Sequence, residues 1–155
     1  MINSSSASPT TSRIAIFGAG LAGLSAALFL DRLNLPITTY ESRPRDTSDG
    51  SFIALAPNAL YVLDQLGIYR QLLAKGFAHE QITFLSSRNH KKIATILNGS
   101  VKRYGYPALK ISRRVLRQTF LEKVLEAGIE VEFEHKLTGI DETSSGGWSH
   151  FLNDL

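Results

Sequence analysis

The sequence predicts an α/β fold, and three observations near its amino terminus lead to that prediction. An apolar run, Ile14–Phe17, is followed by glycines in the spacing G-x-G-x-x-G and then by an apolar segment with helical periodicity. A second apolar run follows that segment and ends in an acidic residue. The glycine motif is weak alone, but between a strand and a helix, with an acid about 20 residues on, it is typical of a Rossmann-like dinucleotide-binding βαβ unit. We therefore expect a βαβ unit with added helices, a small β-hairpin and an incomplete sheet.

Gly18, Gly20 and Gly23 form the glycine motif, and each position has its own physical role. Gly18 permits the sharp turn out of the first strand, and Gly20 lets the backbone approach a pyrophosphate because it has no Cβ. Gly23 allows the following helix to pack closely on the strand. The helix N-terminus then offers unpaired N–H groups and a positive dipole end to the phosphates. We predict that all three glycines bind the cofactor; a ligand-free glycine turn is the alternative.

The elements around the motif follow from residue type. Arg13–Phe17 is short, β-branched and apolar, which predicts a central parallel strand buried on both faces. The apolar helix begins at Leu21 and ends near Leu33, and Pro36–Tyr40 is the second strand. Glu41 stands at the end of that strand, where a carboxylate accepts hydrogen bonds from both ribose hydroxyls and repels a 2′-phosphate. Glu41 is therefore a predicted cofactor ligand that disfavours NADP at this site; a solvated strand-end glutamate is the alternative.

Periodicity and turn residues predict the elements that follow. Apolar stripes bounded by glycines predict helices, and alternation of apolar and polar residues predicts strands. Three glutamates on one face of the last predicted strand indicate a solvated face rather than an acid–base pair, so no catalytic residue is assigned. We expect a polar loop over Ser42–Gly50, a helix from Pro57 to Gly67, a second over Ile68–Lys75, a β-hairpin of Gln81–Leu85 with Lys92–Leu97, a strand over Ala108–Ile111, a helix capped by Ser112, and a half-exposed strand over Ile129–Glu134.

Composition excludes several classes of function. The chain has 155 residues, of which 43% are apolar, a formal net charge of +3 and no cysteine. The lack of cysteine excludes disulfides and cysteine-based metal sites, and no metal site is predicted. The positive charge is scattered without a basic stripe, so we expect no nucleic-acid partner. No apolar segment reaches the roughly 20 residues that span a bilayer, so we expect no membrane contact and a cytoplasmic location.

Several stretches together resemble the FAD-dependent aromatic monooxygenases, the para-hydroxybenzoate and salicylate hydroxylase-like group. The resemblance covers residues 13–140 and depends on the order and spacing of the matching pieces more than on any one of them. These pieces are GAGLAGLSAALFL, the strand ending in Glu41, GSFIALAPNAL, GYPAL before Lys110–Ile111, and SRRVLRQTFL.

The resemblance implies FAD as the cofactor, held on the βαβ unit with Glu41 on the adenosine ribose. It also implies a flavin-side contact around Gly50–Ala54, assigned to Ala54, and a cofactor contact from Arg113. A guanidinium at a strand-to-helix junction suits a phosphate or the flavin edge, and a surface arginine in the run Arg113-Arg114 is the alternative. In the family, NAD(P)H reduces the flavin, and oxygen is used to hydroxylate an aromatic or polyketide-like small molecule, a reaction whose chemistry the flavin carries.

The chain also departs from the family pattern. Family members run to well over twice this length and carry a later Asp-Gly motif, a Gly-Asp motif and a sheet that covers the substrate, none of which is found here. We expect a truncated N-terminal portion that is inactive alone and meets an aromatic substrate only in a full-length protein. Two alternatives are a small NAD-binding reductase, weakened by the lack of a catalytic Tyr/Lys or Cys pair, and a non-catalytic nucleotide-binding remnant.

The resemblance and the local patterns divide the chain into three segments. Residues 1–12, MINSSSASPTTS, are rich in Ser and Thr without an apolar core, which predicts a disordered lead rather than a signal peptide. Residues 13–140 are the predicted N-terminal part of an FAD-binding domain. The alternating pattern stops after Ile140, so we expect an irregular tail over 141–155 with no further strand.

Overall fold

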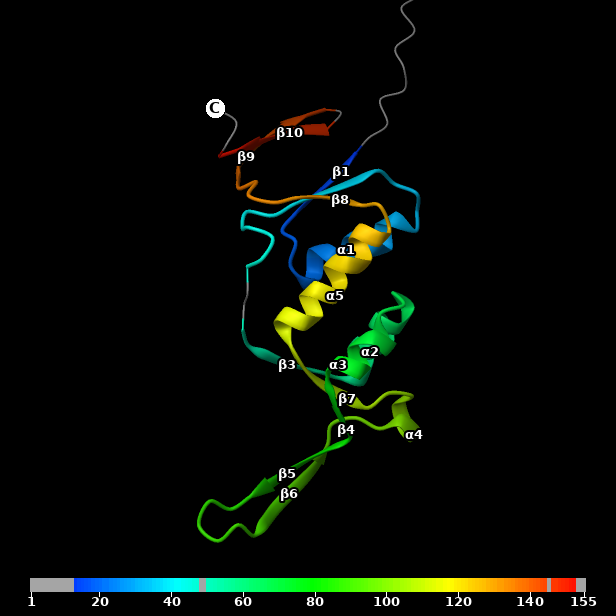
Figure 1. Ribbon diagram of the computed structural model, residues 1–155, viewed down its shortest axis with the longest axis vertical. Helices are drawn as coiled ribbons and strands as arrows, with labels where there is room; N and C mark the ends of the chain where they lie inside the picture. Colours follow the sequence, from blue (N-terminus) through cyan, green and yellow to red (C-terminus); the bar gives the residue numbers. More distant parts are fainter. Residues whose placement is uncertain (1–12, 48–49, 145, 153–155) are drawn as a thin grey trace, which may run out of the picture. The chain divides into compact units, whose positions relative to one another are not determined.

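The computed structural model describes residues 13–47, 50–144 and 146–152. The backbone divides into two compact units, of which the first comprises Met1–Thr47 with Val124–Leu155 and the second Ser48–Lys123. Figure 1 gives the order of the elements along the chain. The expected disordered lead, residues 1–12, lies outside the described residues. No helix in the described part of the chain is long and apolar enough to cross a membrane.

The first unit is built on a parallel three-stranded sheet in the order β1-β2-β8. Apolar and β-branched residues form the strands, with Ile14 of β1 opposite Ile37 of β2 and Phe17 opposite Tyr40. Helix α1 connects β1 to β2 and buries Leu24, Ala27 and Leu28. The predicted βαβ unit is therefore confirmed. Its elements are β1 Ile14–Phe17, α1 Leu21–Asp31, β2 Ile37–Tyr40 and β8 Glu130–Glu132.

The prediction that the first strand is central and buried on both faces is wrong for the described sheet. Among the described residues, β1 pairs with β2 alone, and Phe17 at its end is 38% exposed. The buried central strand is β2, in which Thr38 and Thr39 are as inaccessible as Ile37. The residue types of a short apolar run do not show whether the strand lies at the edge or in the middle of a sheet. That depends on its neighbouring strands, which come from distant parts of the chain.

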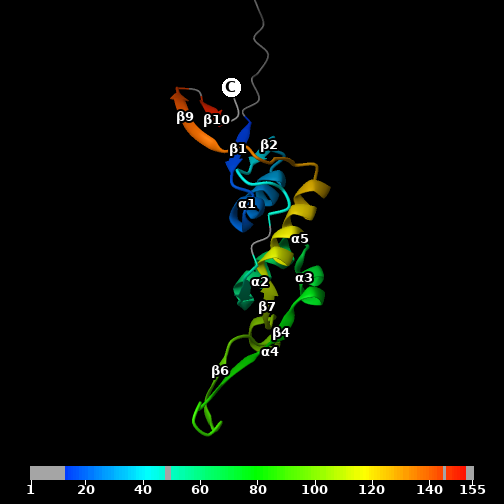
Figure 2. The same cartoon turned by 60° about the vertical axis from the view of Figure 1, so that its left-hand side comes forward.

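The predicted irregular tail is wrong as well, because it contains most of a β-hairpin. Strands β9 (Leu137–Thr143) and β10 (Gly146–Phe151) pair antiparallel (Figure 2). Its strands are largely exposed and polar, so the alternation that marks a half-buried strand is weak. Phe151 packs against Tyr40 with ring centroids 4.7 Å apart, a contact that is remote in sequence.

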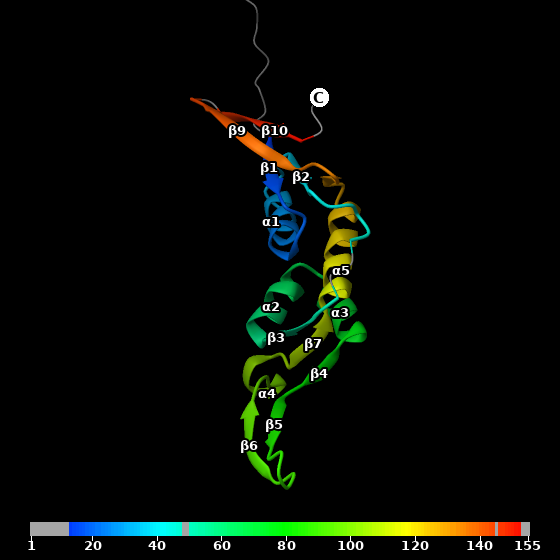
Figure 3. The same ribbon diagram turned by 90° about the vertical axis from the view of Figure 1, so that its left-hand side faces the viewer.

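The second unit contains an antiparallel sheet in the order β3-β7-β4 and a separate two-stranded hairpin, β5-β6. Its core is aliphatic and includes Leu60, Leu72, Leu109 and Ile111, all at most 1% exposed. In Figure 1 and Figure 3 the hairpin extends away from the three-stranded sheet of the same unit. The elements are β3 Phe52–Leu55, α2 Pro57–Gln65, α3 Tyr69–Lys75, β4 Phe77–His79, β5 Gln81–Leu85, β6 Lys92–Leu97, α4 Val101–Tyr104 and β7 Ala108–Ser112.

The sequence predicted helices α2 and α3, the β5-β6 hairpin and strand β7, but it did not predict strands β3 and β4. Strand β3 falls where a flavin-contacting loop was expected, around Gly50–Ala54. It pairs with β7 from Phe52 opposite Ser112 to Leu55 opposite Leu109, so its partner is remote in sequence. Helix α5, Arg113–Glu126, follows β7 directly and buries Leu116, Phe120 and Val124 at the predicted i, i+4 spacing.

Candidate cofactor site

The glycine turn at the carboxyl end of β1 has the backbone geometry that the motif predicts. Gly18 has φ +106°, a conformation that L side chains rarely adopt, and its N–H donates to the Tyr40 carbonyl at 2.7 Å. A Cβ at Gly23 would lie 1.9 Å from the carbonyl oxygen of Gly18, so this glycine is required for the close approach of helix and strand. A Cβ at Gly20 would meet nothing within 4 Å, which leaves the outer side of the turn open.

The first turn of α1 contains no acidic residue and no side-chain cap. Gly20 is the N-cap of the helix. The N-terminal N–H groups of an α-helix have no intrahelical acceptor, and together with the helix dipole they favour an anion. A diphosphate placed against the turn would therefore meet hydrogen-bond donors and a bare backbone surface at Gly20.

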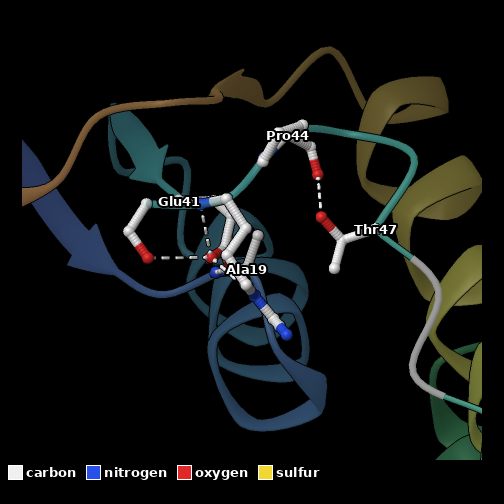
Figure 4. Close-up of polar contacts among 6 residues, drawn as sticks. Ala19, Glu41, Pro44 and Thr47 are labelled. Carbon is white, nitrogen blue, oxygen red and sulfur yellow. Dashed lines mark hydrogen bonds and ion pairs between the residues drawn. The ribbon is translucent and has the colours of Figure 1, made fainter.

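Glu41 lies at the end of β2 with its carboxylate turned toward the glycine turn (Figure 4). The residue is only 4% exposed, and both carboxylate oxygens accept hydrogen bonds. Oε2 accepts the N–H of Ala19 at 2.9 Å, while Oε1 accepts the N–H of Arg43 at 3.0 Å and its Nε–H at 3.4 Å. The Ser42 hydroxyl donates to Oε1 at 3.3 Å. The predicted position of Glu41 at the end of the second strand is confirmed, and its carboxylate lies beside the glycine turn.

Charge and hydrogen bonding keep Glu41 ionised. Burial raises the pKa of the carboxyl, but the N–H groups of Arg43 and Ala19 and the guanidinium of Arg43 outweigh burial, so the pKa is lowered from its ordinary value of 4.5. At neutral pH the group is a carboxylate that accepts hydrogen bonds without donating any. Such a group suits the hydroxyls of a ribose.

A cavity of about 290 Å³ lies beside the glycine turn, at the end of the sheet to which the carboxyl ends of β1 and β2 point. Ligands of open α/β sheets bind outside the carboxyl ends of the strands, so this is the edge at which a cofactor is expected. The lining residues are Phe17, Gly18, Tyr40, Ser42, His135, Lys136 and Leu137.

The two remaining predicted site residues belong to the second unit. Ala54 is an exposed residue of β3 and pairs with Lys110 of β7. Arg113 is the first residue of α5, with its N–H donating to the Ser51 carbonyl at 2.8 Å. The structure therefore brings Gly18, Gly20, Gly23 and Glu41 together in the first unit, and it places Ala54 and Arg113 on neighbouring segments of the second.

Two further residues of the site were missed by reasoning from the sequence. Ala19 contributes its backbone N–H, and Arg43 contributes both a backbone N–H and a guanidinium to Glu41. The position of Arg43, two residues after the strand-end acid, could have suggested an ion pair. The role of Ala19 depends on backbone direction within the turn, which residue type does not reveal.

These features fit the ADP half of a dinucleotide, since the open turn, the uncapped helix and the ionised carboxylate match a diphosphate and a ribose. The first unit thus has the features of a dinucleotide-binding domain. Residues 11–152 match the sequence family described as "FAD binding domain", and the chain belongs to this family. FAD is the cofactor that defines the family, which confirms the cofactor predicted from the resemblance and favours it over the NAD alternative.

The relatives of the chain include proteins named as monooxygenases and hydroxylases. The chain is 35% identical over 117 residues to the FAD-dependent monooxygenase pytG of Aspergillus terreus. This alignment covers 75% of this chain and 34% of that protein. It is 32% identical over 118 residues to 3-hydroxybenzoate 6-hydroxylase 1 of Aquipseudomonas alcaligenes, covering 75% of this chain and 30% of that protein. The chain thus spans about a third of the length of these relatives.

A solved structure shows the same fold. Klebsiella pneumoniae HpxO complexed with FAD and uric acid superposes with a TM-score of 0.76 at 20% identity, over 91% of this chain and 35% of that one. The α/β fold class predicted from the sequence, with small sheets that do not close, is therefore confirmed.

Proposed function

We propose that this chain binds FAD chiefly through the ADP half of the cofactor, with the glycine turn on the diphosphate and Glu41 on the adenosine ribose. The observation that supports this most strongly is the buried, ionised carboxylate of Glu41 next to an open glycine turn. Gly18 shapes the turn, Gly20 leaves room for the diphosphate, and Gly23 holds the helix N-terminus in place.

Ala54 and Arg113 are proposed for the flavin side of the cofactor. Ala54 is exposed on β3, where a small side chain leaves space for a ring system. Arg113 is exposed at the start of α5, and its guanidinium suits a phosphate or the polar edge of the flavin. When bound, FAD would supply the redox chemistry, while these residues bind and orient it.

The activity proposed for a full-length protein is NAD(P)H- and oxygen-dependent hydroxylation of an aromatic or polyketide-like small molecule. The relatives support this reaction class, because they include a hydroxylase of 3-hydroxybenzoate and a monooxygenase of 3-amino-4-hydroxybenzoate. The 155-residue chain is proposed to bind cofactor without turnover. The domain limits of 13–140 and the cytoplasmic location remain predictions from the sequence.

A titration of the purified chain with FAD, ADP and FMN tests the proposed cofactor site. We expect FAD and ADP to bind with affinities within a few-fold of each other and FMN, which lacks the ADP half, to bind far more weakly. Flavin fluorescence and calorimetry measure the affinities. Glu41→Ala should weaken ADP binding by about 1–3 kcal/mol through the lost hydrogen bonds to the ribose.

The matched control is Glu142→Ala, because Glu142 is an exposed glutamate of β9 in the same unit. This variant should bind ADP like the parent chain. Equal affinities for FMN and FAD, or unchanged ADP affinity in Glu41→Ala, would contradict the proposed site. NAD(P)H-dependent hydroxylation by the chain alone would contradict the proposed lack of turnover.

A further inference from the structure

Ala19 lies in the middle of the glycine turn, and its buried N–H meets a charged acceptor from a distant part of the chain. The residue is 0% exposed, and its N–H donates to Oε2 of Glu41 at 2.9 Å across 22 positions of sequence. A hydrogen bond to an ionised acceptor is roughly twice as strong as one between neutral groups. This contact therefore joins the turn to the end of β2 without any ligand.

The carboxylate that accepts this bond is itself held from several directions. The Glu41 N–H donates to the Glu132 carbonyl at 2.8 Å, and the Glu41 carbonyl accepts the His135 N–H at 2.9 Å. The N–H of Arg43 and its guanidinium hold the other carboxylate oxygen, Oε1. The position of Oε2 is thus set by the ends of β2 and β8, so the carboxylate is a fixed point for the turn.

The turn needs such a fixed point because its backbone is intrinsically free. Ala19 stands between two glycines, and glycine loses more conformational freedom on folding than any other residue. A turn that sampled many orientations would have to be ordered when a diphosphate bound, at the expense of affinity. Because the Glu41 carboxylate already holds the N–H of Ala19, part of the cost of ordering the turn is removed before the diphosphate binds.

We propose that Glu41 is a positioning residue for the phosphate-binding turn, in addition to the ribose ligand assigned to it above. This inference rests on the proposed cofactor site and adds a role that is independent of the ribose. Both roles are chemically compatible, because two carboxylate oxygens offer about four acceptor positions. The two N–H donors of Arg43 and the Ser42 hydroxyl share Oε1, and the Ala19 N–H takes one position of Oε2, so a ribose hydroxyl would use the second position of Oε2.

A ligand without ribose hydroxyls separates the two roles. Binding of ADP and of 2′,3′-dideoxyadenosine diphosphate is measured by calorimetry for the parent chain and for Glu41→Ala, Glu41→Gln and the control Glu142→Gln. If Glu41 positions the turn, the two Glu41 variants lose affinity for the dideoxy ligand by roughly tenfold, the factor for one charge-assisted hydrogen bond. The loss for ADP should be larger, and Glu142→Gln should change neither affinity.

Amide hydrogen exchange of Ala19 in the ligand-free chain is the second readout. We expect slow exchange in the parent chain and in Glu142→Gln, and exchange at least roughly tenfold faster in the Glu41 variants, because a buried N–H loses its charged acceptor. Glutamine has nearly the same shape as glutamate, so both measurements can be made on Glu41→Gln if Glu41→Ala fails to fold.

The outcomes distinguish failure of this inference from failure of the cofactor site. Loss of ADP affinity with unchanged dideoxy-ligand affinity and unchanged Ala19 exchange would leave Glu41 as a ribose ligand and overturn the positioning role. Unchanged affinity for both ligands would overturn the positioning role and the cofactor site together. Reduced affinity for both ligands together with faster exchange of the Ala19 N–H would support both the positioning role and the cofactor site.

Discussion

The glycine turn of the first unit and the hairpin of the second unit use buried and exposed groups in opposite ways. Around the turn, a charged side chain is buried and fully engaged, since Glu41 is 4% exposed and both of its oxygens accept hydrogen bonds. On the β5-β6 hairpin, apolar side chains are exposed, among them Ile93 at 68% and Ile96 at 54%. The Glu41 carboxylate therefore has its hydrogen-bond partners within its own unit, whereas the hairpin is not stabilised by a core of its own.

The register of the hairpin explains its surface. Ile82 lies opposite Ile96 and Phe84 opposite Ala94, so one face is apolar. Thr83 lies opposite Thr95 on the other face, with their hydroxyls 3.4 Å apart. A two-stranded hairpin is at best marginally stable in water without packing against other elements. Its stability must therefore depend on cross-strand pairs and on its continuity with the rest of the second unit.

The largest effect expected is that of Gly23→Ala, because this substitution should impair both folding and FAD binding. The added Cβ would lie 1.9 Å from the Gly18 carbonyl oxygen, which is backbone and cannot move aside without shifting α1 from β1. We expect a loss of about 3 kcal/mol in the free energy of unfolding, as for severe overpacking, and loss of FAD binding. Urea denaturation and flavin fluorescence measure the two quantities.

Gly20→Ala is the matched control for that substitution. Its Cβ would meet no atom within 4 Å, and its φ of −81° is open to alanine, so folding stability should change little. Its FAD affinity should nevertheless fall, because the new methyl group would occupy the side of the turn assigned to the diphosphate. A Gly23→Ala chain as stable as the parent would show that the close packing of α1 on β1 is not needed.

The next effect sharpens the contrast between core and hairpin within the second unit. Leu109 of β7 is 0% exposed, and Leu109→Ala should lower the free energy of unfolding by about 2–5 kcal/mol through lost burial and a residual cavity. Ile96→Ala on the hairpin removes a side chain that is already half exposed, so its effect should be smaller than about 1 kcal/mol. Equal losses in urea denaturation would show that the hairpin face is buried in solution.

A pH-dependent effect is expected at Glu41, smaller than the effect of Leu109→Ala. Its pKa is lowered in the folded chain, so the stabilisation it gives is present above the ordinary value of 4.5 and is lost as pH falls through the lowered pKa. Glu41→Gln should therefore be less stable than the parent at pH 7, by about 1–2 kcal/mol for the weakened hydrogen bonds. The gap should narrow in urea denaturation below pH 4.5. A constant gap across that range would mean that the charge of Glu41 does not contribute to stability.

Much of the proposed cofactor site could be predicted because its signals are local. The spacing of Gly18, Gly20 and Gly23 between an apolar strand and an apolar helix, with Glu41 at the end of the next strand, indicated the correct βαβ unit. The same reasoning missed β3 and the C-terminal hairpin. Strand β3 depends on pairing of Phe52 with Ser112, and the hairpin packs through Phe151 on Tyr40, so both depend on partners that are remote in sequence.

The amino-acid sequence alone predicted the βαβ unit, the glycine turn and the acid at the end of β2. These follow from steric limits on glycine and from periodicity, which act over a few residues. The pairing of the strands in space makes β2 rather than β1 the buried strand, and it brings the Glu41 carboxylate to the N–H of Ala19 inside the turn. Burial and hydrogen bonding across 22 positions depend on which segments meet in space, and residue type alone does not specify that.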